Sequence, residues 1–399
     1  MSTRPNIFAP DIRANPYPLY AALRRDAPVC QVDPGGFWAI SRYDDVLAVL
    51  KDTQLYSSEG FLLFADKRWL PRNPLADTLL SMDPPRHGQL RALISRAFGP
   101  AAMARLEPRI RARVEELAAA LPAGRTVDFV EAFSMPLPSF AIGTLLGLPT
   151  STHGFFTRWA TDAINVPGVR DDDLDAQART RASLVEMDGY IDEVLKDRRK
   201  SPANDFVTDL VRVQLDDKTP SHSELRGFMS LLLVAGLDTT VHLLNFVVQA
   251  LSEHPEALAR VRADRSQVPA FVEEVLRYYA PAQSVLRLTT AEVELHGVQL
   301  PAGAPVLALI GSANRDERRF ADPDRFDVTR GGTNSTPFGH GAHFCLGAAL
   351  ARMEARMTVE ALLDRFQGFE VKTDQFEWNH SLTLRGPLVM PVELRAQAA

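Results

Sequence analysis

The stretch that decides the fold is Pro337-Phe-Gly-His-Gly-Ala-His-Phe-Cys-Leu-Gly347, a glycine-punctuated loop that leads into an apolar helix predicted over 348–363. Its glycines allow backbone conformations that a side chain would block. The loop delivers Cys345 to a helix N-terminus, where unpaired backbone N–H groups and the helix dipole favour a thiolate. A thiolate in an apolar loop is a metal ligand or a nucleophile.

Several interpretations of Cys345 are open on these residues alone. Together with His340 and His343 it could belong to a zinc site, although no fourth ligand and no second cysteine pair lie nearby in the sequence. A cysteine hydrolase would need a histidine base and an orienting Asn or Asp elsewhere in the chain. A buried, inert cysteine is the usual role of a lone cysteine.

Composition narrows the class of protein. The 399 residues carry 44 Lys plus Arg against 50 Asp plus Glu, a net charge of -6, which argues against a nucleic-acid partner. Only two cysteines occur, Cys30 and Cys345, too few for a disulfide framework. The N-terminus shows no secretory signal, and the longest apolar run, 227–237, is shorter than the ~20 residues of a membrane span. We therefore expect a cytoplasmic protein without a membrane segment.

Helical periodicity dominates the pattern along the chain. This periodicity covers most of 85–256. The predicted strands are short, most of them follow this range, and strands and helices do not alternate regularly. With no linker or repeat, the sequence predicts a single domain over 1–399, mainly α with small β-sheets. The predicted helices lie at 19–25 and 271–278, and the predicted strands at 37–40, 285–300 (with a turn at 295–297) and 305–310.

One predicted helix is unusually long. It begins at the capping box Ser221-His-Ser-Glu224 and continues to His254, about 50 Å at 1.5 Å per residue. Its middle, Ala235-Gly-Leu-Asp-Thr-Thr240, places small and polar residues inside an apolar stripe. Either one helix is locally broken there, or two helices meet with Asp238 or Thr239 as an N-cap.

The segment Phe338 to Gly347 resembles the heme-binding loop of the cytochromes P450, the heme-thiolate monooxygenases. Other segments resemble the family's motifs in the expected order, so that the similarity covers nearly the whole chain. It implies the family's triangular, mainly helical single-domain fold, with small sheets and a long central helix over the heme. The matching segments are Asn15-Pro-Tyr-Pro18, Asp83-Pro-Pro-Arg-His87 with Arg91, Ala235 to Thr240, Glu274-Val-Leu-Arg277, and Asp322-Pro-Asp-Arg-Phe326.

The resemblance implies heme b as the cofactor and a role for each matched residue. Cys345 would be the iron ligand, with the backbone at Gly347 close to its sulfur and Phe338 shielding it. The propionates of heme would be held by His87, Arg91, Arg287 and His343.

The central segment would handle oxygen. Asp238 would pass protons from solvent, and Thr239 would donate a hydrogen bond at the oxygen site. Ala235 would leave space above the iron, at a local break in the helix that could be a π-bulge. Glu274, Arg277 and Arg325 would form a buried structural network that fixes the loop leading to Cys345.

The resemblance also implies a substrate pocket and a type of substrate. One continuous helix face would run from Leu231 through Val234 and Ala235 to the oxygen site. A medium to large apolar substrate follows, although Lys67, Arg68 and Arg72 could attract a carboxylate or simply face solvent. The remaining pocket residues would be Phe61 and Leu62, with Leu63, Phe64 and Trp69 in the same loop, and Gln283, Val285 and Thr383.

The expected function is monooxygenation by a monomer. Electrons would come from a ferredoxin, or a flavodoxin, with an NAD(P)H-dependent reductase. Two other heme-protein functions stay open: a peroxide-driven oxygenase, which generally lacks the acid and alcohol present here as Asp238 and Thr239, and a heme-binding sensor without turnover. Candidate docking cations are Arg96, Arg105, Arg109, Arg111 and Arg352.

Overall fold

The structure, a computed structural model, describes residues 4–62, 67–76, 78–95, 98–212, 220–331 and 334–397. The chain divides into two compact units that alternate along the sequence. The first unit takes residues 1–57, 114–134 and 239–399, and the second takes 58–113 and 135–238. Helices dominate and the sheets are small, which confirms the predicted fold class.

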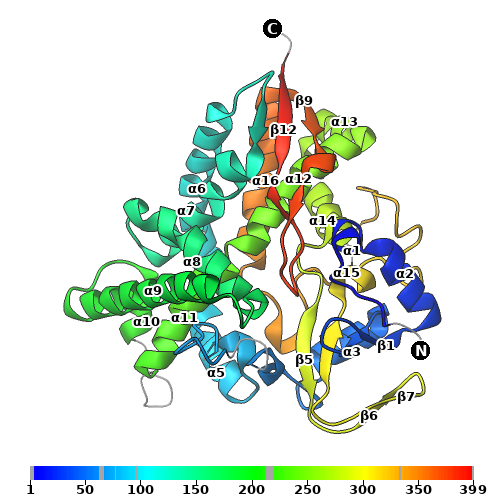
Figure 1. The fold of residues 1–399 in the computed structure, drawn as a ribbon. Helices are drawn as coiled ribbons and strands as arrows, with labels where there is room; N and C mark the ends of the chain where they lie inside the picture. The colour runs from blue at the N-terminus through cyan, green and yellow to red at the C-terminus, as the bar shows by residue number, and fades with distance from the viewer. Residues whose placement is uncertain are drawn as a thin grey trace. The chain divides into compact units, whose positions relative to one another are not determined.

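The first unit contains a five-stranded sheet, which includes β1 and β5 (Figure 1). β2 and β8 pair in parallel, with Trp38 opposite Val306, and the other neighbours are antiparallel. Val46 of α3 (Tyr43–Lys51) is fully buried in the same apolar core as Val306, so this helix covers the sheet. The strand order is β1 (Val29–Val32), β2 (Phe37–Ile40), β8 (Pro305–Ala308), β5 (Val285–Thr289) and β3 (Tyr56–Ser57).

The rest of the first unit comprises a second sheet, two hairpins and further helices. In the second sheet β12 (Pro391–Ala396) lies between β4 (Thr126–Asp128) and β9 (Phe366–Val371). The hairpins pair β6 (Val293–Leu295) with β7 (Val298–Leu300), and β10 (Glu377–Trp378) with β11 (Pro387–Val389). The helices are α1 (Pro10–Ala14), α2 (Tyr17–Asp26), α12 (Asp238–Glu253), α13 (Pro255–Ala263), α14 (Val268–Tyr279), α15 (Ile310–Ala313) and α16 (Ala348–Arg365).

The described part of the second unit is helical. α11 (His222–Ala235) begins at the predicted capping box, in which Ser221 and Glu224 bond each other's backbone N–H. It contacts α7, α8 and α9 and buries an apolar face against them. The other helices are α5 (Arg86–Ser95), α7 (Pro136–Leu146), α8 (His153–Asn165), α9 (Leu174–Lys200) and α10 (Phe206–Arg212), and α6 (Pro100–Ala120) passes from this unit into the first.

Two local predictions need correction. The strand predicted to reach residue 310 ends at Ala308, because Ile310 already starts α15. Residues 126–128, inside the range predicted as helical, form β4 because β12 offers a pairing edge. The long apolar segment is two helices, one of the two arrangements that the sequence left open. The stretch His222–Glu253 is apolar and long enough to cross a bilayer, but 78% of its most apolar window is buried inside the protein, as in a core helix.

Candidate active site

The loop from Pro337 to Gly347 folds back so that its cysteine lies beside its own first residues. The backbone N–H of Cys345 donates to the carbonyl of Phe338 at 3.0 Å. Gly341 has a φ of +71°, and a Cβ atom there would lie 2.8 Å from the carbonyl oxygen of Leu50. Only glycine accommodates both this conformation and this approach. The loop is therefore fixed against the end of α3 in the same unit.

Cys345 lies two residues before Gly347, which caps the N-terminus of α16. Both cysteines are described residues, and neither is in a disulfide; Cys345 is exposed. The Cβ position of Gly347 is 4.0 Å from the sulfur of Cys345, so the backbone of residue 347 lies beside it. The guanidinium of Arg352 lies 4.5 Å from the ring centroid of Phe338. Shielding of the sulfur by Phe338 stays a prediction.

A zinc site at this loop would need three or four ligands in one place. Among the residues that the structure describes, no group of three His, Cys, Asp or Glu side chains is placed to hold a metal ion. The loop thus offers one sulfur ligand rather than a cluster, which suits a cofactor that brings its own equatorial ligands.

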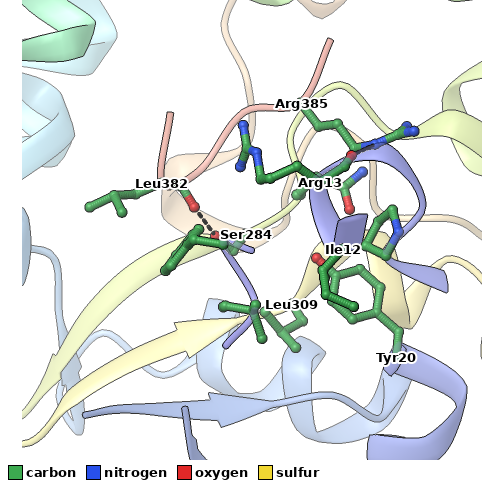
Figure 2. Close-up of a pocket in the computed structure, with 11 residues that line it drawn as sticks. Ile12, Arg13, Tyr20, Ser284, Leu309, Leu382 and Arg385 are labelled. Carbon is green, nitrogen blue, oxygen red and sulfur yellow. Dashed lines mark hydrogen bonds between the residues drawn. The ribbon is translucent and has the colours of Figure 1, made fainter. Parts of the chain in front are cut away.

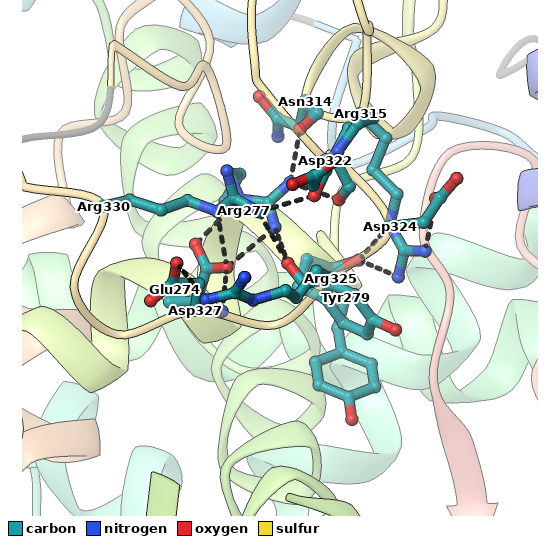
Figure 3. Close-up of polar contacts among 12 residues, drawn as sticks. Glu274, Arg277, Tyr279, Asn314, Arg315, Asp322, Asp324, Arg325, Asp327 and Arg330 are labelled. Carbon is teal, nitrogen blue, oxygen red and sulfur yellow. Dashed lines mark hydrogen bonds and ion pairs between the residues drawn. The ribbon is translucent and has the colours of Figure 1, made fainter.

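Glu274 and Arg277 form a buried ion pair one turn apart on α14. Nε and Nη2 of the guanidinium donate to the two carboxylate oxygens at 2.8 and 2.7 Å, and both side chains are almost fully buried. The remaining Nη1 donates to the carbonyls of Asn314 and Pro323 at 3.1 and 2.8 Å (Figure 3). A bidentate pair of this kind is strong and geometrically specific.

Asn314 connects this pair to the cysteine loop. Its side-chain oxygen accepts the backbone N–H of Thr336 at 2.7 Å, and the carbonyl of Thr336 accepts the N–H of Gly339 at 3.0 Å. Through these contacts α14 holds the start of the loop that carries Cys345. The geometry supports the structural role predicted for the pair.

The second guanidinium on Glu274 belongs to Arg330 and not to Arg325. Nε of Arg330 lies 3.2 Å from Oε1 of Glu274, and its side chain is 13% exposed. The Arg325 side chain is 66% exposed and pairs with a nearby aspartate. Its backbone N–H closes a turn on the carbonyl of Asp322, and this turn directs the Arg325 carbonyl toward Arg277, at 3.1 Å. Arg325 therefore joins the predicted network through its backbone carbonyl, and its side chain lies outside the network (Figure 3).

The central apolar segment is two helices, α11 and α12, separated by a turn at Gly236 and Leu237. The N–H of Leu237 donates to the carbonyl of Val234 at 3.4 Å, a three-residue step. The break is thus a tightened turn and not a π-bulge, which would widen the helix. A Cβ atom on Gly236 would lie 2.5 Å from Cδ1 of Ile142, so glycine lets α7 approach the turn. The predicted continuous face holds only as far as Ala235.

The residues around this break are accessible, although the helices on either side are buried. Ala235 is exposed and Asp238 and Thr239 are partly buried, whereas 227–234 and 240–251 are buried throughout. Desolvation raises the pKa of Asp238 to about 6. A carboxyl group with a pKa near neutrality can both take up and release a proton under physiological conditions. The break therefore combines space with a group suited to proton transfer.

Comparison with known proteins assigns these features to one family. The family model described as Cytochrome P450 matches residues 173–391, which include the break, the buried Glu274–Arg277 pair and the cysteine loop. The chain belongs to the cytochrome P450 family. This confirms the resemblance drawn from the sequence.

Similar P450s match this chain over nearly its whole length. The monooxygenase PikC of Streptomyces venezuelae is 38% identical, over 96% of this chain and 92% of that protein. The 6-deoxyerythronolide B hydroxylase of Saccharopolyspora erythraea is 35% identical, over 99% and 100%. The solved structure of the P450 CYP109Q5 from Chondromyces apiculatus is 38% identical, with a TM-score of 0.90 over 100% of both chains. The chain is thus an oxygenase of this family.

The cofactor of the P450 family is heme b, and the residues present fit it. Cys345 supplies one sulfur at a helix N-terminus, which stabilises a thiolate ligand. Heme b also carries two propionates, and a buried guanidinium is most stable beside a carboxylate. In the first unit Arg287 on β5 is 4% exposed and His343 is partly buried; in the second, α5 carries His87, 1% exposed, and Arg91. The assignment of these four to the propionates stays a prediction.

The structure brings two predicted substrate residues of the first unit together. The N–H of Gln283 donates to the carbonyl of Thr383 at 2.7 Å, just before Val285 opens β5. In the second unit Leu231 and Val234 are buried on α11, and Phe61 and Leu62 are partly buried. Leu63 and Phe64 lie outside the described residues.

Arg72 is already neutralised within the second unit. Its guanidinium lies 3.2 Å from Asp188 on α9, and Arg226 of α11 lies 3.8 Å from the same carboxylate. Burial raises the pKa of Asp188, partly offset by these two cations. An arginine engaged in this way is a poor receptor for a substrate carboxylate.

Two buried ionisable residues escaped the sequence analysis, His242 on α12 and Glu354 on α16. Burial and the charges of Arg13 and Arg385 lower the pKa of His242 to about 3. Burial raises the pKa of Glu354 well above its ordinary value. Each interrupts an apolar helix face, and this interruption is the sequence signal that could have identified them.

Proposed function

We propose that this P450 inserts one atom of O₂ into a medium to large apolar substrate, with electrons from a separate ferredoxin and its NAD(P)H-dependent reductase. The observation that carries this proposal is the accessible pair Asp238 and Thr239 at a break in otherwise buried, apolar helices. When bound, heme supplies the thiolate-ligated iron that activates oxygen.

The chain's own residues would control protons and water at this site. Asp238, with a pKa near 6, holds a proton at its carboxyl group and releases it inward. The Thr239 hydroxyl orients that proton by a hydrogen bond. The apolar side chains of Leu231 and Val234 exclude bulk water, which favours an apolar substrate.

The electron donor would be recognised by cations on the protein surface. Some candidates already have partners: Arg352 lies 2.5 Å from Glu273, and Arg111 lies 3.3 Å from Glu107. Arg109 lies 6.0 Å from the ring of Phe140. Arg105 is a further candidate, and Arg96 lies outside the described residues. Reduction by ferredoxin that slows steeply with added salt would support charge-guided docking, and a flat response would contradict it.

Substitution of Thr239 tests the oxygen chemistry. In Thr239→Ala the enzyme should still consume NAD(P)H but release hydrogen peroxide in place of oxygenated product, because the hydrogen bond that orients the proton is lost. Product, peroxide and NAD(P)H consumption are measured together in the reconstituted ferredoxin chain. Thr240→Val is the control, since Thr240 is buried next to the pair. Unchanged coupling in Thr239→Ala would contradict the proposal.

We also propose that residues 1–399 act as one domain and as a monomer. Size-exclusion chromatography with light scattering of the heme-loaded protein tests the second point. A single cooperative thermal transition, followed both by heme absorbance and by circular dichroism, tests the first.

A further inference from the structure

A turn over residues 379–386 joins β10 to β11 and contains Thr383. The N–H of Asn379 donates to the carbonyl of Gly386 at 3.0 Å, which closes the base of the turn. A Cβ atom on Gly386 would lie 2.1 Å from the ring of His242. The base of the turn therefore packs directly on α12, one helical turn beyond Thr239.

Arg13 of α1 organises this turn through several acceptors. Its guanidinium donates to the backbone carbonyls of Ser381, Asn379 and Leu384 at 2.6, 2.8 and 2.9 Å, and also to the side-chain oxygen of Asn379. Arg13 is 8% exposed, so these bonds are shielded from water. A planar guanidinium has enough N–H groups to donate to several acceptors spread around it in this way, whereas a lysine ammonium does not.

The same contacts extend in a defined direction to His242. An arginine only donates, so the Asn379 side-chain oxygen must face Arg13 and its Nδ2 must face the histidine. Nδ2 lies 2.8 Å from Nε2 of His242, which therefore accepts, and the ring proton is on Nδ1. Arg13, Asn379 and His242 thus form one oriented chain from the N-terminal helix to α12.

Packing alone does not hold the turn on its α1 side. A small cavity, with room for about one water molecule, lies between α1, α2 and the chain at Ser284 and Leu382 (Figure 2). The Ser284 hydroxyl donates to the carbonyl of Leu382 at 3.3 Å across its edge. Arg13 lines the same cavity. Because the turn is not closely packed where it borders this cavity, polar contacts contribute to its position.

We propose that Arg13 is a positioning residue for the substrate: through Asn379 and His242 it holds the turn 379–386 in place on α12 and so sets the shape of the pocket at Thr383. The inference rests on the proposed function, because it takes Thr383 as pocket lining. Loss of Arg13 lets the turn move toward the cavity, which enlarges the pocket and reduces its selectivity.

The test uses the heme-loaded enzyme and two heme ligands, imidazole and the larger 4-phenylimidazole, each followed by the Soret shift. Arg13→Gln and Asn379→Leu should change the ratio of the two dissociation constants by about tenfold, since each removes charged hydrogen bonds in a buried site. Backbone amides in 380–385 should also exchange hydrogen faster. Arg25→Gln is the control, because Arg25 is exposed and pairs with its neighbour Asp26 on α2.

A conservative variant keeps the test informative if Arg13→Gln folds poorly. Asn379→Asp retains an oxygen for Arg13 and a partner for His242, so its ratio of dissociation constants should stay near that of the native enzyme. An unchanged ratio in Asn379→Leu would overturn the proposal, even if amide exchange is faster, since the role would then be structural only. If the native enzyme lacked a red-shifted ferrous CO band, the proposed function would be refuted instead. Amide exchange in Arg13→Gln would then still test whether Arg13 holds the turn 379–386.

Discussion

Two of the sites in the first unit that bury guanidinium groups compensate the charge in different ways. Arg277 meets the carboxylate of Glu274 through two hydrogen bonds. Arg13 is held by carbonyl and amide oxygens, and Arg385 donates to the carbonyls of Arg13 and Ala14 at 2.8 and 2.6 Å. The guanidinium of Arg385 also lies 4.1 Å from an aromatic ring centroid, that of a tryptophan on β10.

The difference shows what each type of contact can do. The carboxylate of Glu274 compensates the full charge of Arg277, so losing Glu274 leaves the buried guanidinium uncompensated. Carbonyl dipoles share the compensation among many weak partners, so losing one of them removes only part of it. The first arrangement suits permanent support of the Cys345 loop, and the second suits a turn whose position shapes selectivity.

Glu274→Gln should have the largest effect, because it removes the carboxylate that compensates the buried guanidinium of Arg277 and leaves that charge with neutral partners. We expect a loss of about 3–5 kcal/mol in the free energy of unfolding and a low heme content. Urea denaturation and heme per chain measure both. Glu273→Gln is the control, since its partly exposed pair with Arg352 is worth about 0–1 kcal/mol. Similar losses in the two variants would contradict the comparison.

A second test compares the loss of stability in Arg330→Gln with the loss in Arg325→Gln, and we expect the first loss to be of intermediate size. Arg330 donates to the buried carboxylate of Glu274, so its removal should cost about 1.5–3 kcal/mol. Arg325 is exposed and contributes a backbone carbonyl that survives substitution, so its removal should cost about 0–1 kcal/mol. The midpoints of thermal or urea unfolding of the two variants measure both losses. The reverse order would restore the prediction made for Arg325 from the sequence.

Glu354 provides the opposite case, a buried carboxyl whose Oε2 has no hydrogen-bond partner among the described residues. Its raised pKa means that the folded chain holds the proton more tightly than the unfolded chain. The contribution of Glu354 to stability is therefore most favourable below its ordinary pKa of about 4.5 and becomes less favourable as the pH rises toward the folded-state pKa. Glu354→Gln should remove this loss, by about 1.4 kcal/mol for each pKa unit. Urea midpoints at acid and neutral pH measure it, and a pH-independent difference would contradict the prediction.

Much of the fold followed from local sequence signals. The capping box at Ser221, the glycines of the cysteine loop and the alternation from Val285 onward each act over a few residues, and the structure confirms the elements they predicted. The pairing of Glu274 with Arg277 was also predictable, because residues three apart on a helix share one face.

The errors came from contacts that sequence spacing does not encode. The choice of Arg330 over Arg325 depends on how a loop turns, and the order of residues is compatible with either. The tightened turn at Gly236 depends on the approach of Ile142 from another helix. The hydrogen bonds of Arg13 to the turn 379–386 join segments at opposite ends of the sequence, so no local pattern could have indicated them.

The distance along the chain between Arg13 and its acceptors has a consequence for biosynthesis. Ser381 follows Arg13 by 368 residues, and the cysteine loop rests on the backbone of Leu50 through Gly341. Contacts of such large sequence separation form late, because a long loop must close before they contribute any stability. The N-terminal segment must therefore wait for the last part of the chain to leave the ribosome, and heme capture is expected to be a post-translational event.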